Sequence, residues 1–201
     1  MNMFPTKKCA KEGCNEYALT NSEFCINHIP NREKYISDLK KLLQERDYFR
    51  DLSACGIELE NMDLSGKHFT ECNFSKSRFK NVKFDATKIT MVFFDFSLFE
   101  NCSFKETEIR CTVFGGSKIN NCTFEGSDIL RCNFNGTICT NVSFNGSDLY
   151  SSRFVNSSLN NIQLIDCNLK NVHFEKSIKH NVNMKYSNIE EAYLEDEEIT
   201  L

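Results

Sequence analysis

The sequence predicts a solenoid, a small coil wound many times, and two observations support this prediction. Asparagine recurs every 20 residues along most of the chain, at Asn61, Asn81, Asn101, Asn121, Asn141, Asn161 and Asn181. Within this repeat an apolar residue returns every five residues from Leu59 to Ile199, except at Lys179. A fixed period of about 20 residues is typical of architectures in which each unit is one turn. We expect residues 57–189 to form one continuous coil.

The distribution of charged residues shows which positions of each five-residue repeat point inward. We label the apolar position i; position i-2 is mostly small or aliphatic, as at Val82 and Ser97. Residues 57–201 carry 15 Lys or Arg and 20 Asp or Glu, and only Lys67, Lys179 and Glu197 stand at i or i-2. Charged side chains avoid a protein interior, so both positions are inward. Of the 29 residues at i, 13 are Phe, which predicts a bore filled by rings rather than a channel.

Five of the 11 cysteines occupy i-2, where we expect small buried thiols. They are Cys72, Cys102, Cys122, Cys132 and Cys167. Cys102 and Cys122 would stack on adjacent turns, near disulfide distance, but a reducing cytosol favours free thiols. The N-terminal MNMFPTKKCA has no apolar signal-peptide core, and no apolar run approaches a membrane span. We therefore expect a cytoplasmic protein with no membrane contact.

Motifs such as NCSF, NCTF, GSDI, GSDL and NNIQL resemble the pentapeptide-repeat family, with its A(D/N)LXX-type consensus. The resemblance covers about 145 residues, although this chain favours Phe over Leu at i and Ser, Cys or Val over Ala at i-2. It implies an all-β solenoid: a right-handed quadrilateral β-helix with four pentapeptides per turn, about seven coils in all. It also implies a bacterial protein, and a homodimer is one candidate assembly because family members that protect DNA gyrase often dimerise through their C-terminal ends.

Residues 1–30 are expected to form a zinc-binding module. Cys9, Cys14, Cys25 and His28 have the spacing C-x4-C-x10-C-x2-H. Three thiolates and one imidazole complete the tetrahedral shell of a structural Zn²⁺ site, and metal binding would supply the folding free energy of so short a stretch. The stretch resembles short Cys3His zinc modules with the pattern CxxxGCxxxAxxxxxFCxxH, which Gly13, Ala18 and Phe24 also match. The alternative is three unliganded cysteines with a chance histidine.

Residues 31–56 are expected to form an amphipathic helix and a lead-in to the coil. Asn31 is a candidate N-cap after Pro30. From Arg32 to about Arg50, one face collects Tyr35, Ile36, Leu39, Leu42, Leu43 and Phe49 at helical spacing. Solenoid ends expose strand edges that need covering, which favours a capping helix over a helix that binds a partner.

Residues 190–201 are expected to form an acidic C-terminal cap or tail. Six acids crowd this end: Glu190, Glu191, Glu195, Asp196, Glu197 and Glu198. Lys179 at an inward position should loosen the coil shortly before it. Ser187 and Glu190 have the spacing of a capping box, so a short final helix competes with a last coil.

Apolar residues at outward positions form the candidate partner-binding surface. Met91 and Phe96 stand at i+2, Phe93 and Leu98 stand at i-1, and Val113 lies one turn beyond Phe93. Exposed apolar clusters mark contact sites. The alternative is that a loop, the N-terminal module or a second copy covers them.

The sequence carries no constellation for catalysis. His68, His173 and His180 are scattered, and we find no paired carboxylates, glycine-rich phosphate loop or Ser/His/Asp order. The net charge is -4, and residues 57–189 sum to +1, so direct nucleic-acid binding is not expected. We expect a non-enzymatic scaffold for an unknown protein partner.

The alternative is a gyrase-binding DNA mimic, like the quinolone-resistance branch of the family. Such a mimic needs a dense negative stripe. Lys76, Arg78, Lys80, Lys83 and Lys88 place positive charge on the early turns instead.

Overall fold

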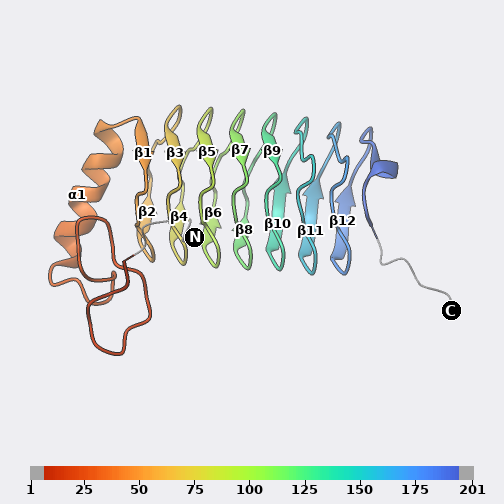
Figure 1. Ribbon diagram of the computed structural model, residues 1–201. Coiled ribbons are helices and arrows are strands. Elements are labelled where there is room, and N and C mark those ends of the chain that lie inside the picture. The colour runs from red at the N-terminus through yellow and green to blue at the C-terminus, as the bar shows by residue number, and fades with distance from the viewer. Residues whose placement is uncertain (1–6, 195–201) are drawn as a thin grey trace.

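The computed structural model describes residues 7–194, and it shows a coil with a helix and a loop-rich module at its N-terminal end (Figure 1). Helix α1, Arg32–Glu45, precedes strands that fall into two parallel sheets. The first sheet holds β1 (Tyr48–Arg50), β3 (His68–Thr70), β5 (Lys88–Thr90), β7 (Glu108–Arg110) and β9 (Asp128–Leu130). The second holds β2 (Glu58–Glu60), β4 (Arg78–Lys80), β6 (Leu98–Glu100), β8 (Lys118–Asn120), β10 (Ile138–Ser143), β11 (Ser158–Gln163) and β12 (Ile178–Asn183).

Strand register confirms the predicted period. Each strand pairs in parallel with the strand one turn away, at an offset of 20 residues, as in Phe49↔Phe69 and Leu59↔Phe79. Isolated bridges with the same offset join the remaining sides of the coil. The predicted four-sided solenoid of about seven coils is therefore confirmed.

Every corner of the coil has the same backbone conformation. One residue in five, over 51–186, has a φ between 51° and 72°. Asn and Gly tolerate this left-handed region better than other residues. In the asparagine column the side chains also bond between turns: Asn81 Nδ2 donates to Asn61 Oδ1 at 2.8 Å, and Asn161 Nδ2 donates to Asn141 Oδ1 at 2.9 Å. The recurring asparagine therefore builds one corner of the coil.

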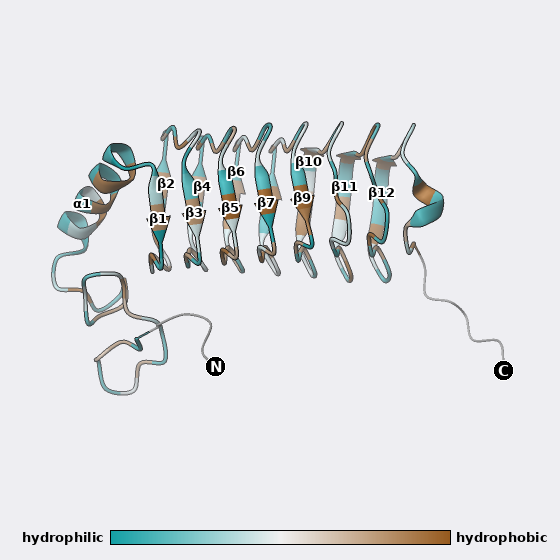
Figure 2. Ribbon diagram, turned by 45° about the horizontal axis from the view of Figure 1, so that its top comes forward, coloured by the Kyte–Doolittle hydropathy of each residue, from teal (hydrophilic) through white to brown (hydrophobic). Residues whose placement is uncertain are grey.

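Phenylalanine rings fill the bore. Along most strands, polar and apolar residues alternate (Figure 2). Rings stack along the coil with centroids 4.6 to 5.6 Å apart in two columns, Phe74, Phe94, Phe114, Phe134, Phe154 and Phe174 on one side and Phe84, Phe104, Phe124 and Phe144 on the other. Rings of opposite columns meet edge to face, as Phe114 and Phe124 do at 6.2 Å and 89°. Both arrangements are favourable for aromatic pairs. The two predicted columns are confirmed.

Cysteines at i-2 are buried, as predicted. Their thiols donate to backbone carbonyls, as Cys132 does to Ile109 O at 3.5 Å. Burial raises the pKa of Cys72 to about 11 and the pKa of Cys132 to about 12. Cys102 and Cys122 are free thiols joined by a hydrogen bond from the Cys102 backbone N–H to the Cys122 Sγ, at 3.4 Å.

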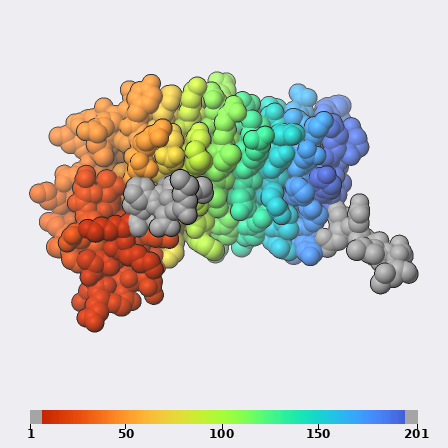
Figure 3. All heavy atoms as spheres, in the orientation of Figure 1, coloured from red at the N-terminus to blue at the C-terminus, as the bar shows by residue number. Residues whose placement is uncertain are grey.

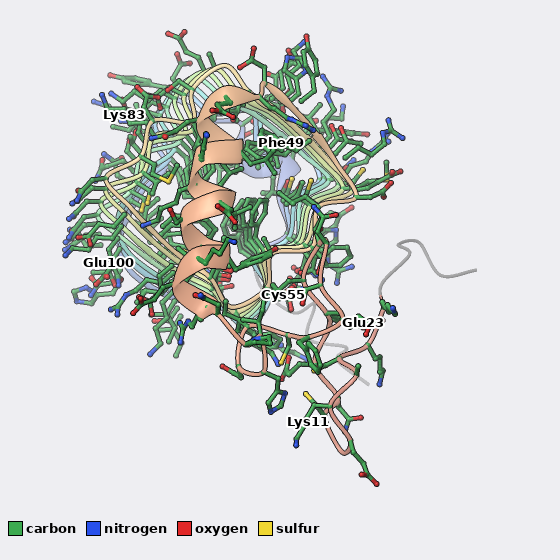
Figure 4. The ribbon with its side chains drawn as sticks, turned by 90° about the vertical axis from the view of Figure 1, so that its left-hand side faces the viewer. Lys11, Glu23, Phe49, Cys55, Lys83 and Glu100 are labelled. Atoms are coloured by element: carbon green, nitrogen blue, oxygen red, sulfur yellow. The ribbon has the colours of Figure 1, made fainter. Side chains whose placement is uncertain are left out.

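Helix α1 lies across the N-terminal end of the coil (Figure 4). Asn31 caps it as predicted, because its Oδ1 accepts a hydrogen bond from Lys34 N at 2.9 Å. The prediction that the helix continues to about Arg50 is wrong: it ends at Glu45, and Phe49 belongs to strand β1. Residues 51–56, predicted as a lead-in, are already part of the first turn of the coil.

Lys67, one of the few charges at an inward position, holds the end of this helix. Its side chain is 8% exposed, and Nζ donates to the carbonyl oxygens of Gln44 and Arg46 at 3.4 and 2.8 Å and to Asp47 Oδ1 at 3.2 Å. The last carbonyls of a helix lack partners within the helix, and a cation there is favourable. Lys67 therefore joins α1 to the first coil.

The coil continues past residue 189. His173 bridges to Tyr193, and Phe174 N donates to Tyr193 O at 2.7 Å. The 3-10 helix η1, Ile189–Glu191, lies within this last turn and has no side-chain cap, so the capping-box spacing of Ser187 and Glu190 forms no cap.

The strand pairing continues through Lys179, which is paired with Leu159 in β12, although β12 is more exposed than β10 and β11. The Lys179 Nζ donates to the carbonyl oxygens of Phe174 and Leu194, each at 3.3 Å. The expected loosening is therefore a loss of burial and not of register. Most of the predicted acidic tail, residues 195–201, lies outside the described residues.

Candidate metal centre and partner surface

The N-terminal module brings the four predicted metal ligands together. The ligand atoms of Cys9, Cys14, Cys25 and His28 all lie within 4.8 Å of one another. His28 Nδ1 is 3.5 Å from Cys9 Sγ and 3.4 Å from Cys25 Sγ, and the sulfurs of Cys14 and Cys25 are 3.9 Å apart. Zn–S bonds of about 2.3 Å and Zn–N bonds of about 2.0 Å give tetrahedral edges of about 3.8 Å between sulfurs and about 3.5 Å between sulfur and nitrogen. The donor set therefore fits a closed tetrahedral zinc site.

Local turns position these ligands. Gly13, with a φ of 74°, closes a turn in which Cys14 N donates to Lys11 O at 3.0 Å. A second turn, in which His28 N donates to Cys25 O at 3.0 Å, brings the imidazole back to the sulfurs. Burial disfavours the Cys9 thiolate, but hydrogen bonds from the backbone of Cys25 and Lys11 and from His28 outweigh it and lower the pKa of Cys9 to about 6. The thiolate is the form that binds metal.

The module is attached to the first turn of the coil. Thr20 N donates to Ser53 O at 2.8 Å, Ser53 N donates to Thr20 Oγ1 at 2.7 Å, and Ser53 Oγ donates to Ala18 O at 2.7 Å. An ion pair of 2.6 Å joins Lys76 Nζ to Glu16 Oε1. In Figure 3 the module lies against the N-terminal end of the rod.

Sequence reasoning missed this attachment. Thr20 and Ser53 belong to no motif. Gly56 is the one feature of the sequence that could have indicated a close contact here. Its backbone is left-handed, with a φ of 71°, and a Cβ at this position would be 2.9 Å from Ile26 Cγ2. The glycine allows the module to approach the coil closely.

The structure places most of the candidate partner surface on one side of the rod. Phe93 pairs with Val113 on the next turn, and Met91 and Phe96 occupy the two corners that border this side. Leu98 begins β6, around the corner. Phe96 is 67% exposed, and the other four are partly buried.

Cys111, which is exposed, extends this surface by one corner beyond Met91. We refer to the resulting surface as the apolar band; it consists of Met91, Phe93, Phe96, Leu98, Cys111 and Val113.

The comparison with protein families identifies the coil. Residues 56–90 and 127–162 match the family described as pentapeptide repeats, with 8 copies. These two stretches of the coil are therefore pentapeptide repeats. The N-terminal module lies outside the matched residues, so its candidate metal site rests on ligand type and geometry. No curated protein matches the chain.

Two solved structures have similar coils. HetL, a pentapeptide repeat protein involved in heterocyst differentiation regulation from the cyanobacterium Nostoc sp., is 10% identical, with a TM-score of 0.40 and coverage of 77% of this chain and 94% of HetL. QnrB1, a plasmid-mediated fluoroquinolone resistance protein, is 14% identical, with a TM-score of 0.48 and coverage of 74% of this chain and 90% of QnrB1.

Across residues 7–194, no helix has both the length and the apolar character needed to cross a bilayer.

Proposed function

We propose that this chain is a non-enzymatic scaffold that presents one side of a rigid rod to a protein partner. The apolar band carries the proposal. Phe96 is 67% exposed at a corner of the coil, next to Phe93 and Val113. Clustered apolar side chains at the surface mark contact sites, and aromatic side chains often dominate the energy of protein contacts.

The coil suits this role because it holds the band rigidly. Backbone hydrogen bonds run from turn to turn on all sides, as Phe93 N to Cys72 O at 2.9 Å and Phe94 N to Val113 O at 2.7 Å. Phe94 behind the band is fully buried between Phe74 and Phe114. A preorganised surface loses little conformational entropy on binding.

We also propose that Cys9, Cys14, Cys25 and His28 hold a structural Zn²⁺ ion. Because the protein supplies all four ligands, no position remains open for a substrate. The metal would keep the module folded against the first turn, beside the capping helix α1. A reducing cytoplasm suits both the zinc thiolates and the buried thiols of the coil.

No observation favours the DNA-mimic alternative. Cations of the early turns pair with acids of neighbouring turns, as Lys80 with Glu60 at 2.9 Å and Arg78 with Glu100 at 3.3 Å. Alternating pairs of this kind give a surface of mixed sign rather than a negative stripe.

A pull-down with mass spectrometry tests the scaffold. Phe93→Asp with Phe96→Asp should remove the captured partner and leave the circular dichroism of the coil unchanged. The control is Lys83→Asp with Ala86→Asp, on the opposite side of the rod. It is matched because Ala86, like Phe96, occupies a corner of the coil, with a φ of 54° against 56° for Phe96. A partner list that survives the first pair of substitutions would contradict the proposal.

A further inference from the structure

Three residues of the apolar band occupy positions that the fold alone does not favour. Met91, Phe96 and Cys111 have φ angles of 53°, 56° and 51°. Large side chains are strained in this region, where Gly and Asn are at ease. Glycine does occupy the two corners after Phe96 in the same column, Gly116 and Gly136. Other corners of the coil carry polar or charged residues in the same conformation, so the apolar side chains here are a feature of this stretch and not of the fold.

Beside Phe96 the surface forms a shelf floored by backbone. The ring lies over Gly116, since a Cβ at that residue would be 2.6 Å from the Phe96 Cε1. A Cβ at Gly136, one turn further, would meet nothing within 4 Å. Gly115 lies beside Val113, whose Cγ1 would be 3.8 Å from an added Cβ. An aromatic wall next to bare backbone suits an extended segment that lies along the rod.

The band is too small for a stable contact between two folded copies. Two turns extend about 10 Å along the rod, and the eight residues from Met91 to Leu98 extend at most about 25 Å around it. A stable interface buries about 800 Å² on each partner. The size of the band instead matches the one or two anchor residues of a linear segment.

Cations follow the band toward the C-terminal end of the rod. Arg131 occupies the corner after Cys111, and Arg153 lies on the same side as Val113, which it reaches through the bridges of Asn133. Within residues 7–194 neither arginine forms a salt bridge. The side carries two acids: Asp95 accepts a hydrogen bond from Ser75 Oγ at 2.8 Å, and Glu175, which lies near the charge of Arg153, binds His173 at 2.8 Å. The two arginines stand two and three turns beyond Phe93, or about 10 to 14 Å. An extended chain covers that distance in three to four residues.

We propose that the apolar band and these two arginines together bind one linear segment of a partner protein. The segment carries two apolar anchors, which contact Phe93 and Phe96. It also carries an Asp or Glu three to four residues away, which faces Arg131 and Arg153. This inference rests on the proposed scaffold function and adds the chemistry of the ligand.

Selection of a phage-displayed library of random 12-residue peptides on the full-length protein tests the inference. The enriched peptides should share two apolar residues and an acid three or four positions from one of them. A synthetic peptide of that consensus, followed by fluorescence anisotropy, should bind Phe96→Asn about tenfold more weakly. Asn suits this corner, so the variant keeps the coil, and circular dichroism checks this.

Charge variants separate the acidic requirement from the apolar one. Arg131→Glu with Arg153→Glu should weaken peptide binding several-fold at low salt, with a smaller loss at high salt because exposed charges are screened. Lys83→Glu, on the opposite side of the coil (Figure 4), should leave binding unchanged.

Three outcomes would overturn the inference. The selection could enrich no shared motif, or it could enrich a motif that lacks an acid. The variant Arg131→Glu with Arg153→Glu could also bind the peptide as tightly as the unchanged protein does. A dimer in sedimentation velocity that Phe96→Asn abolishes would assign the band to a second copy. If Phe96 is needed to capture a folded partner while peptides do not bind, the scaffold stands and this inference falls.

Discussion

The side chain at each corner decides what that corner contributes, because the backbone there is everywhere the same. Asparagine at a corner bonds to the next asparagine, as Asn81 does to Asn61 at 2.8 Å. Glycine leaves the backbone bare at Gly116 and Gly136, and phenylalanine at Phe96 puts a ring in solvent. The same position of the repeat therefore carries both the structural asparagines and the exposed ring of the proposed partner surface.

Two glycines provide a matched test at the scale of one residue. Gly116→Ala and Gly136→Ala should each lower the free energy of unfolding by about 1 to 2 kcal/mol, since alanine is strained in the left-handed region. Their φ angles are 67° and 66°, so the backbone costs should agree. Urea unfolding measures both.

The two variants should differ in partner capture. In Gly116→Ala the new Cβ meets the Phe96 ring, which is exposed and free to turn away, so capture should fall. In Gly136→Ala the Cβ enters open space, so capture should persist. Equal capture by both variants would show that the position of the Phe96 ring over Gly116 has no role in binding.

Among the elements, the capping helix was predictable at its start and not at its end. Asn31 and the helical spacing through Leu43 fixed the beginning. The end was misplaced because Phe49 fits both a helical face and the five-residue phase of the coil, in which it stands five before Ala54. Ala54 is too small to reveal that phase from the sequence. The Lys67 contacts that mark the true end join residues 20 or more apart in sequence.

The proposed metal ligands were predictable as a cluster because their types and spacing are local features. Cys9, Cys14, Cys25 and His28 meet as the spacing required. The attachment of the module was not predictable, because Thr20 and Ser53 meet through hydrogen bonds between residues 33 apart that no pattern announces.

Removal of the metal tests the module as an element. We expect one equivalent of zinc in the purified protein and none in Cys14→Ser with Cys25→Ser, measured by elemental analysis. Without metal, amides of residues 9–28 should exchange rapidly, because the ion supplies most of the stability of so short a stretch. The coil should keep its circular dichroism, since its ladder runs from turn to turn independently of the module.

Cys122→Ser with Cys132→Ser is the control for zinc content. These two buried thiols lie in the coil, far from the module in sequence, and should leave one equivalent bound. Zinc-free wild-type protein that still protects residues 9–28 from exchange would contradict a structural role for the metal.

At the scale of the whole molecule, the coil was predictable because one period governs it from end to end. The members of the apolar band were predictable as outward residues for the same reason. Their arrangement was less predictable, because it follows only from the four-sided geometry. Met91, Phe93, Phe96 and Val113 share one side of the coil, and Leu98 lies around the corner.

Deletions test the period across the whole molecule. Removal of residues 141–160, one complete turn, should leave a folded, shorter coil, because the residues brought together keep their sides and neighbours. Removal of residues 141–145 shifts every later residue by one side of the coil. It therefore separates the rings of Phe134 and Phe154, whose centroids are 4.7 Å apart in the intact protein. We expect that variant to lose cooperative thermal unfolding by circular dichroism. Equal folding of both deletions would contradict a fixed register.

The covered N-terminal end gives the rod a polarity in assembly. Parallel coils with open strand edges at both ends can add copies indefinitely, head to tail, into a fibre. Helix α1 closes one of these ends. An association that joins coil ends must then use the other end of both molecules, and such a two-fold contact is complete at two copies. Any end-to-end association would therefore stop at a pair.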